Sequence, residues 1–327
     1  MYSVGFYIGL ILIGVFAGFV SGLLGVGGGF LMVPLQYFLL SSEGIDPSLA
    51  MVVSVATSLA IIIPTASTGA YRHQKVNKDI VKPGIALGIF GIVGSFAGGL
   101  LAVYIPTYYL QIVFSILLIG VAINMIRGSL KDDAEGDSND SDDGESSALI
   151  GFNVLAFVCV GFAVGILSGL LGVGGGIFII PILTMIFGFK LTKAIGTSSV
   201  YISLTAIGGV ISYIYSGWGL NPLSLSLGYV SLINWILIVL FSVPMASLGA
   251  KLVYKVPEKK LKIVFAILIF FIPLEKFIID LLNHNHPQSV IFNFPGSLIY
   301  IFFFSFSLFF INFSLPNPSQ TLPQPLP

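Results

Sequence analysis

The chain has 327 residues, of which 56% are hydrophobic and only 9% are charged. Soluble globular domains carry about a quarter charged residues, so a water-soluble fold is excluded. Apolar runs of about eighteen or more residues recur along almost the whole length, and each is long enough for a helix to cross a hydrocarbon core of about 30 Å. The composition therefore predicts a bundle of membrane-spanning helices.

The first apolar stretch, residues 4–23, lacks the basic region of a cleaved signal peptide, so we expect it to be retained as a helix. It leads into Ser-Gly-Leu-Leu-Gly-Val-Gly-Gly-Gly at residues 21–29, which recurs without change at residues 168–176. The flanking residues Gly14, Gly18 and Pro34 recur as Gly161, Gly165 and Pro181. The chain therefore contains two copies of one unit.

The repeat and the composition divide the chain into five parts. We predict a first transmembrane repeat at 1–130, an acidic disordered linker at 131–149, a second repeat at 150–284, an extra hydrophobic helix at 288–313 and a Pro-rich disordered tail at 314–327. The linker holds eight of the fourteen acidic residues and cannot bury apolar surface. The expected helices are 4–23, 28–41, 51–71, 81–104 and 108–127 in the first repeat, and 150–170, 175–188, 194–216, 224–250 and 261–282 in the second.

The second helix of each repeat is short. Fourteen residues at 1.5 Å per residue reach only about 21 Å, which is less than the hydrocarbon thickness. These segments either penetrate partway, as a re-entrant hairpin, or cross with help from their neighbours.

The positions of lysine and arginine predict the topology, because cytoplasmic loops collect these residues. Thirteen of the fourteen fall into four clusters, at 72–82, 127–131, 190–193 and 251–262. All four clusters share one side only if each half crosses the membrane an odd number of times. The second half then enters the bilayer upside down, so we expect inverted-topology repeats with glycine-broken helical hairpins, which are a transporter architecture. The basic loops and the central linker are expected in the cytoplasm, and the chain in the plasma membrane.

The glycine run at residues 25–29 predicts a helix break, since each glycine costs about 1 kcal/mol relative to alanine inside a helix. Backbone freed at membrane depth is tolerated only where protein buries it or where it lines a cavity. After each break a short helix begins, at Phe30 and Ile177, and its N-terminus presents unpaired N–H groups that favour an anion. The alternative is that the glycines only let helices pack closely, as expected for Gly18-x-x-x-Gly22.

Hydroxyl side chains accompany each break. Ser21 and Ser168 stand directly before the breaks, and a Thr-Ser pair comes early in the next helix of each half. A single Ser or Thr within a helix usually bonds its own backbone, so a structural role is the alternative. The predicted substrate-binding residues are Ser21, Gly25, Gly27, Gly28, Gly29, Thr57 and Ser58 in the first half and Ser168, Gly172, Gly174, Gly175, Gly176, Thr197 and Ser198 in the second.

The two Ser-Gly-Leu-Leu-Gly-Val-Gly-Gly-Gly-x4-Pro stretches, at 21–34 and 168–181, resemble those of the TauE/SafE sulfite exporter family. The resemblance spans about residues 5–282. It implies a multi-pass carrier of sulfite, sulfoacetate, thiosulfate or related sulfur anions, with the glycine motifs near the substrate path. The acidic linker and the Phe-rich final helix do not belong to the family pattern.

Glu275 lies about fourteen residues into the last predicted helix of the second repeat. An ionisable group at such depth is a functional hypothesis by default, which makes Glu275 a coupling candidate. The alternative is an outer-interface cluster of Glu275, Lys276 and Asp280.

The predicted function is a secondary transporter and not an enzyme, because the predicted spans contain almost no nucleophiles, acids or metal ligands. A passive anion channel and a structural or partner-binding membrane protein without transport are the alternatives. Cys159 is the only cysteine and the three histidines show no zinc spacing, so neither a metal site nor a cofactor is predicted. No Lys-Ser or Lys-Thr follows the glycines, which excludes a nucleotide loop. The expected partners are the lipid bilayer and a small inorganic or organic sulfur anion, and no nucleic acid.

Overall fold

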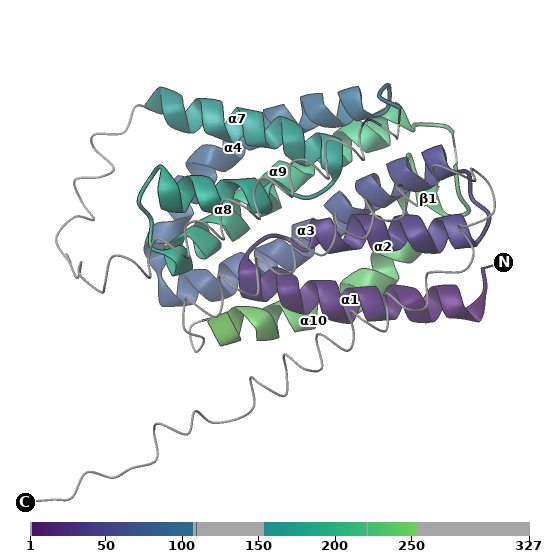
Figure 1. Cartoon of the computed structure of the whole chain (residues 1–327), viewed down its shortest axis with the longest axis horizontal. Coiled ribbons are helices and arrows are strands. Elements are labelled where there is room, and N and C mark those ends of the chain that lie inside the picture. Colours follow the sequence, from purple (N-terminus) through teal and green to yellow (C-terminus); the bar gives the residue numbers. More distant parts are fainter. Residues whose placement is uncertain (1, 107–108, 110–153, 221, 254–327) are drawn as a thin grey trace, which may run out of the picture. The chain divides into compact units, whose positions relative to one another are not determined.

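The computed structural model describes residues 2–106, 109, 154–220 and 222–253. The elements of the first half are α1 (Val4–Leu24), α2 (Gly29–Ser42), α3 (Pro47–Val76), the 3-10 helix η1 (Lys78–Ile80) and α4 (Val81–Ala102). Those of the second half are α7 (Val154–Leu171), α8 (Gly176–Met185), α9 (Leu191–Ser216), the short strands β1 (Ser226–Leu227) and β2 (Val230–Ser231), and α10 (Leu232–Leu252) (Figure 1). The predicted all-α class is confirmed for these residues.

Five stretches of the described chain are long and apolar enough to cross a membrane: α1, α3, η1 with α4, α9 and α10. The breaks predicted at the glycine motifs are confirmed, because α1 ends at Leu24 and α2 begins at Gly29, while α7 ends at Leu171 and α8 begins at Gly176. The predicted linker at 131–149, the helices at 108–127, 261–282 and 288–313, and the tail at 314–327 lie outside the described residues, apart from the single residue Tyr109.

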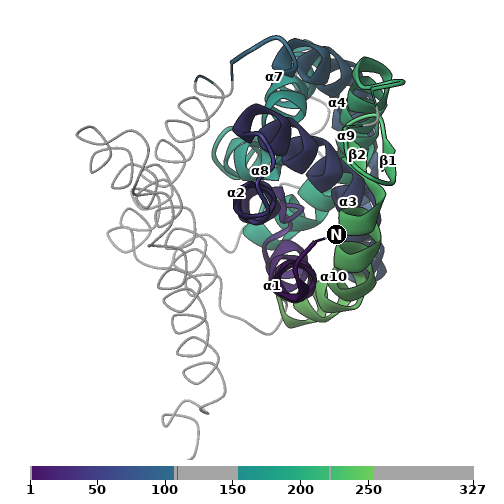
Figure 2. The same ribbon diagram turned by 90° about the vertical axis from the view of Figure 1, so that its right-hand side faces the viewer.

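The helices α3 and α9 form the centre of this packing (Figure 2). A Cβ added to Gly209 of α9 would lie 2.6 Å from Leu59 of α3, and one added to Gly69 would lie 3.7 Å from Ser199. These two contacts pair later residues of one helix with earlier residues of the other, so α3 and α9 run antiparallel. Each is flanked by a helix pair, α1 with α10 on one side and α4 with α7 on the other (Figures 1 and 2).

Both flanking pairs join helices from opposite halves of the sequence. Gly14 of α1 packs so closely on α10 that an added Cβ would lie 2.8 Å from the carbonyl oxygen of Ile238. The same stripe continues with Gly18 on Ser242 and Gly22 on Ala246, so α1 and α10 run parallel.

The second pair repeats this arrangement. The α7 glycines Gly161, Gly165 and Gly169 meet the backbone of Leu87, Gly91 and Ser95 of α4. Both stripes are therefore close-packing faces, as the small-residue spacing predicts. The first long helix of each half packs on the last described helix of the other.

The segment before α10 is not helical, so the predicted start of this helix is wrong. The sequence predicts helix from residue 224, but α10 begins only at Leu232. Residues 226–231 instead form an antiparallel strand pair with Gly228 at φ 57°, a backbone conformation that glycine adopts without steric cost. Ser231 then caps α10 by accepting a hydrogen bond from the Asn234 N–H at 3.4 Å.

Basic residues of three helices gather at one end of this packing. Arg72, near the end of α3, donates from Nε to Ser247 Oγ at 2.9 Å, one turn before Lys251 of α10. At the start of α9, a Cβ on Gly196 would lie 3.0 Å from Ile80, the last residue of η1. The basic residue Lys78 is the first residue of the same short helix. The ends of α3 and α10 and the start of α9 therefore lie together.

Candidate functional site

Each glycine break bends the chain through left-handed backbone. In the first break (residues 25–28), Gly25, Gly27 and Gly28 have φ values of 65°, 83° and 74°. In the second break (residues 172–175), Gly172, Gly174 and Gly175 have φ values of 70°, 77° and 79°. L-residues with a side chain rarely adopt this region, so these six positions require glycine.

At the helix starts that follow the breaks, the N–H groups have no acceptor among the described residues. Gly28 and Gly175 occupy the N-cap positions of α2 and α8, and neither helix has a side-chain cap. Within the described residues, no hydrogen bond uses the N–H groups of residues 26–30 or 173–177, although all ten residues are buried. Buried N–H groups are almost always paired, and at a helix start they carry partial positive charge. The two breaks thus present two donor clusters suited to an anion.

Each half holds the break of the other half in place. Ser58 Oγ of α3 donates to the Gly172 carbonyl oxygen at 2.9 Å, and Ser198 Oγ of α9 donates to the Gly25 carbonyl oxygen at 2.6 Å. Both serines are fully buried. They are predicted site residues, and in the structure their hydroxyl groups fix the backbone of the breaks.

The two breaks also contact each other directly. A Cβ on Gly29 would lie 2.8 Å from the Cα of Val173, and a Cβ on Gly176 would lie 2.7 Å from the Cα of Val26. Only glycine allows this approach, so the helix starts of α2 and α8 lie together at the crossing of α3 and α9.

Two isoleucines, one from each half, pack against both breaks. A Cβ on Gly27 would lie 2.9 Å from Ile202 Cγ2 and 3.3 Å from Ile62 Cγ2, and a Cβ on Gly174 would lie 2.5 Å and 3.3 Å from the same atoms. Ile62 and Ile202 are both fully buried. They form the apolar side of the site.

The other predicted hydroxyl groups differ in their partners. Thr57 Oγ1 accepts a hydrogen bond from the Ser231 N–H at 3.0 Å. Ser168 Oγ and Thr197 Oγ1 are buried and have no hydrogen-bond partner within the described part of the chain. Ser21 is 3% exposed, and its Cβ lies 3.2 Å from the position of a Cβ on Gly28, while Ser168 Cβ lies 3.4 Å from that on Gly175. Both serines therefore lie against the N-cap glycine of the next helix.

Two buried polar residues, one in α2 and one in α10, were not predicted as site residues. Gln36 of α2 and Asn234 of α10 are buried, and Asn234 Nδ2 donates to Gln36 Oε1 at 3.4 Å. The signal for them was present in the sequence, since amide side chains within apolar helical segments are costly to bury. Glu275 lies outside the described residues, and the residues that are described contain no group of three potential metal ligands.

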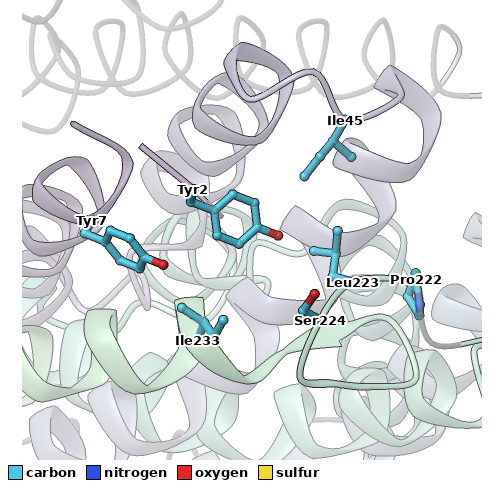
Figure 3. Close-up of a pocket in the computed structure, with 7 residues that line it drawn as sticks. All are labelled: Tyr2, Tyr7, Ile45, Pro222, Leu223, Ser224 and Ile233. Carbon is cyan, nitrogen blue, oxygen red and sulfur yellow. The ribbon is translucent and has the colours of Figure 1, made fainter. Parts of the chain in front are cut away.

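A pocket of about 360 Å³ lies away from the breaks. It is lined by Tyr2, Tyr7, Ile45, Pro222, Leu223, Ser224 and Ile233 (Figure 3). Tyr7 precedes Gly25 by eighteen residues of helix, or about 27 Å. Burial, and then the nearby Tyr7 and Glu43, raise the pKa of the Tyr2 phenol above its ordinary value.

The described chain holds five helices apolar and long enough to span a membrane, and the comparisons with known proteins identify the class as membrane transporters. Residues 10–275 match the family described as "Sulfite exporter TauE/SafE", and the chain belongs to this family. A "Probable membrane transporter protein" of Haemophilus influenzae is 33% identical over 276 residues, which cover 82% of this chain and 97% of the relative. A "Probable membrane transporter protein" of Methanocaldococcus jannaschii is also 33% identical, over 78% of this chain and 89% of the relative. No solved structure matches the chain.

Proposed function

We propose that the protein is a secondary transporter that moves a small, sulfur-containing anion and binds it between the two glycine breaks. The observation that carries this proposal is the pair of buried helix starts, α2 and α8, whose N–H groups have no partner within the described residues. Helix N-termini favour anions through their partial charge and their free donors. The free hydroxyl groups of Ser168 and Thr197 add two donors of the same kind.

We also propose that the halves are inverted repeats. The antiparallel course of α3 and α9 supports this, because these helices hold corresponding positions in the two halves. The first long helices support it as well. α10 runs parallel to α3, since Ser231 bonds Thr57 and Arg72 bonds Ser247, and α4 runs parallel to α9, since Gly84 meets Val200 and Gly99 meets Ser212. Because α1 runs parallel to α10 and α7 to α4, α1 and α7 run in opposite directions. A binding site at the interface of two inverted repeats is open to each side in turn when one repeat moves against the other.

The proposed orientation places the basic ends of α3, α9 and α10 in the cytoplasm of a cell whose plasma membrane holds the protein. The common location of Arg72, Lys78 and Lys251 supports this assignment, because basic residues are retained on the cytoplasmic side.

Sulfite is a proposed substrate because the family is described as a sulfite exporter. Sulfoacetate and thiosulfate are proposed with it as related sulfur-containing anions. The test is uptake of sulfite, thiosulfate, sulfoacetate and sulfate by liposomes that contain the purified protein. A carrier gives saturable flux that exchanges with anion on the other side, whereas a channel gives flux without exchange. Absence of flux for all four anions would overturn the proposal and favour a structural protein.

A further inference from the structure

The buried amide pair Gln36 and Asn234 has hydrogen-bonding groups left over. The two side chains are 0% and 1% exposed. Gln36 Nε2 and Asn234 Oδ1 have no hydrogen-bond partner within the described residues. Reversing both amides would exchange their roles but would again leave one NH2 group and one carbonyl oxygen unpaired. The pair therefore offers one donor group and one acceptor on two side chains that are joined by a hydrogen bond.

The corresponding positions of the repeat have no amide side chains. Gln36 follows Pro34 by two residues, and the position that corresponds to it after Pro181 is the buried Leu183. Asn234 precedes Ile238 by one turn, and the matching position in α4, one turn before Leu87, is the buried Pro83. The corresponding positions of the repeat thus hold buried apolar residues where Gln36 and Asn234 bury two polar side chains, which is costly inside a membrane protein.

A continuous set of contacts joins the amide pair to the proposed site. Ser231 Oγ accepts from the Asn234 N–H, and the Ser231 N–H donates to Thr57 Oγ1 at 3.0 Å. The next residue of α3, Ser58, donates to the Gly172 carbonyl oxygen of the second break. On the other side, Ile233 lines the pocket of Figure 3 and directly precedes Asn234. Asn234 is thus linked through Ser231 and α3 to the second break, and its chain neighbour Ile233 lines the pocket.

We infer that Gln36 and Asn234 form a second subsite for the transported anion, and that this anion is an oxyanion that carries a proton. The inference rests on the proposed function. The free NH2 group donates to an anionic oxygen, and the free carbonyl oxygen accepts a hydrogen bond from the hydroxyl group of the anion, which keeps its proton. A fully deprotonated oxyanion has only acceptors and would leave the carbonyl oxygen unpaired. Hydrogensulfite has the required groups, whereas sulfate at neutral pH does not.

The experiment uses the full chain in liposomes with sulfite as the probe, at a pH below and a pH above the second ionisation of sulfurous acid. The unmodified protein should bind more tightly at the lower pH, where hydrogensulfite predominates. Gln36→Leu should weaken apparent affinity at both pH values by roughly tenfold or more, since a hydrogen bond to a charged group is lost. Asn234→Leu should remove the preference for the lower pH. Leu183→Met, at the corresponding position of α8, is the matched control and should change neither property.

Folding of the variants is measured as the melting temperature of the same preparations. The double variant Gln36→Leu/Asn234→Leu removes both partners together, which leaves no orphaned group and should keep the melting temperature or raise it. Unchanged affinity and unchanged pH preference in the double variant would overturn the subsite and leave the proposed function standing. Failure of the unmodified protein to transport any tested anion would overturn both.

Discussion

Hydroxyl groups that look equivalent in the two copies of the sequence have different partners. Ser58 and Ser198 donate to carbonyl oxygens of the opposite breaks, so their hydrogen bonds are already used. Ser168 and Thr197 are buried without a partner in the described part of the chain. This difference separates the residues that position the site from those that are free to bind an anion.

The free hydroxyl groups give the first prediction. Ser168→Ala and Thr197→Val should each weaken apparent anion affinity roughly ten- to a hundredfold, because a hydrogen bond to a charged group contributes about 1.5 to 3 kcal/mol. Melting temperature should hold or rise, since no hydrogen bond within the described residues is lost. Ser199→Ala is the control, because Ser199 Oγ donates to Ile195 of its own helix at 3.0 Å. Substrate affinity and melting temperature are measured on the same purified variants. Unchanged affinity in both Ser168→Ala and Thr197→Val would overturn the proposed anion site.

The positioning serines give the opposite pattern. Ser198→Ala leaves the buried Gly25 carbonyl oxygen without its donor, and Ser58→Ala does the same at Gly172. Each change should reduce the free energy of unfolding by about 1 to 3 kcal/mol. Thermal melting in detergent measures this loss. A melting temperature equal to that of the unmodified protein would show that the breaks hold their shape without these bonds.

At the scale of helices, the glycine stripe of α1 determines how closely α10 approaches. An added Cβ at Gly22 would overlap the Ala246 carbonyl oxygen, so Gly22→Ala should force the two helices apart. Gly5 of the same helix meets nothing closer than Ser3 Oγ at 3.8 Å. Gly5→Ala should therefore be neutral or stabilise by up to about 1 kcal/mol through helix propensity. Gly22→Ala should lower the melting temperature, whereas Gly5→Ala should leave it unchanged or raise it. Equal melting temperatures of the two variants would refute close packing as the role of the stripe.

Several of these elements could be predicted from the sequence because their causes are local. Apolar length predicts the spans, and consecutive glycines predict the breaks at residues 25 and 172, since both effects depend on neighbouring residues alone. The packing of α1 on α10 and of α7 on α4, each across the two halves, could not be predicted. A glycine stripe such as Gly14, Gly18 and Gly22 shows that a helix packs closely on the stripe, but it does not show which helix. The hydrogen bonds that Ser58 and Ser198 donate could not be predicted either, because they also join opposite halves. The strand pair before α10 was missed because its apolar residues also suit a helix.

At the scale of the whole molecule, topology can be measured from the side of the membrane that each loop faces. Cysteines placed singly at Asn77, Ser138 and Glu258 in a Cys159→Ser background should resist an impermeant thiol reagent in intact cells, because the basic segments around them are expected in the cytoplasm. A cysteine at Ser48, at the other end of α3, should react and serves as the control. Labelling of Ser138 and Glu258 on opposite sides would contradict the inverted arrangement.

The pairing of α1 with α10 has a consequence for how the chain assembles during synthesis. α1 leaves the ribosome before α10, so its glycine face has no partner until residues 232–252 are made, and α4 likewise has none until α7 is made. A half that is made alone therefore lacks the partner of its first long helix, and we expect it to remain open to degradation. Two fragments divided within residues 131–149 should restore transport when they are made together and fail when made singly. The tight packing is thus complete only after the second half has entered the membrane, so the protein acquires its stability late in biogenesis.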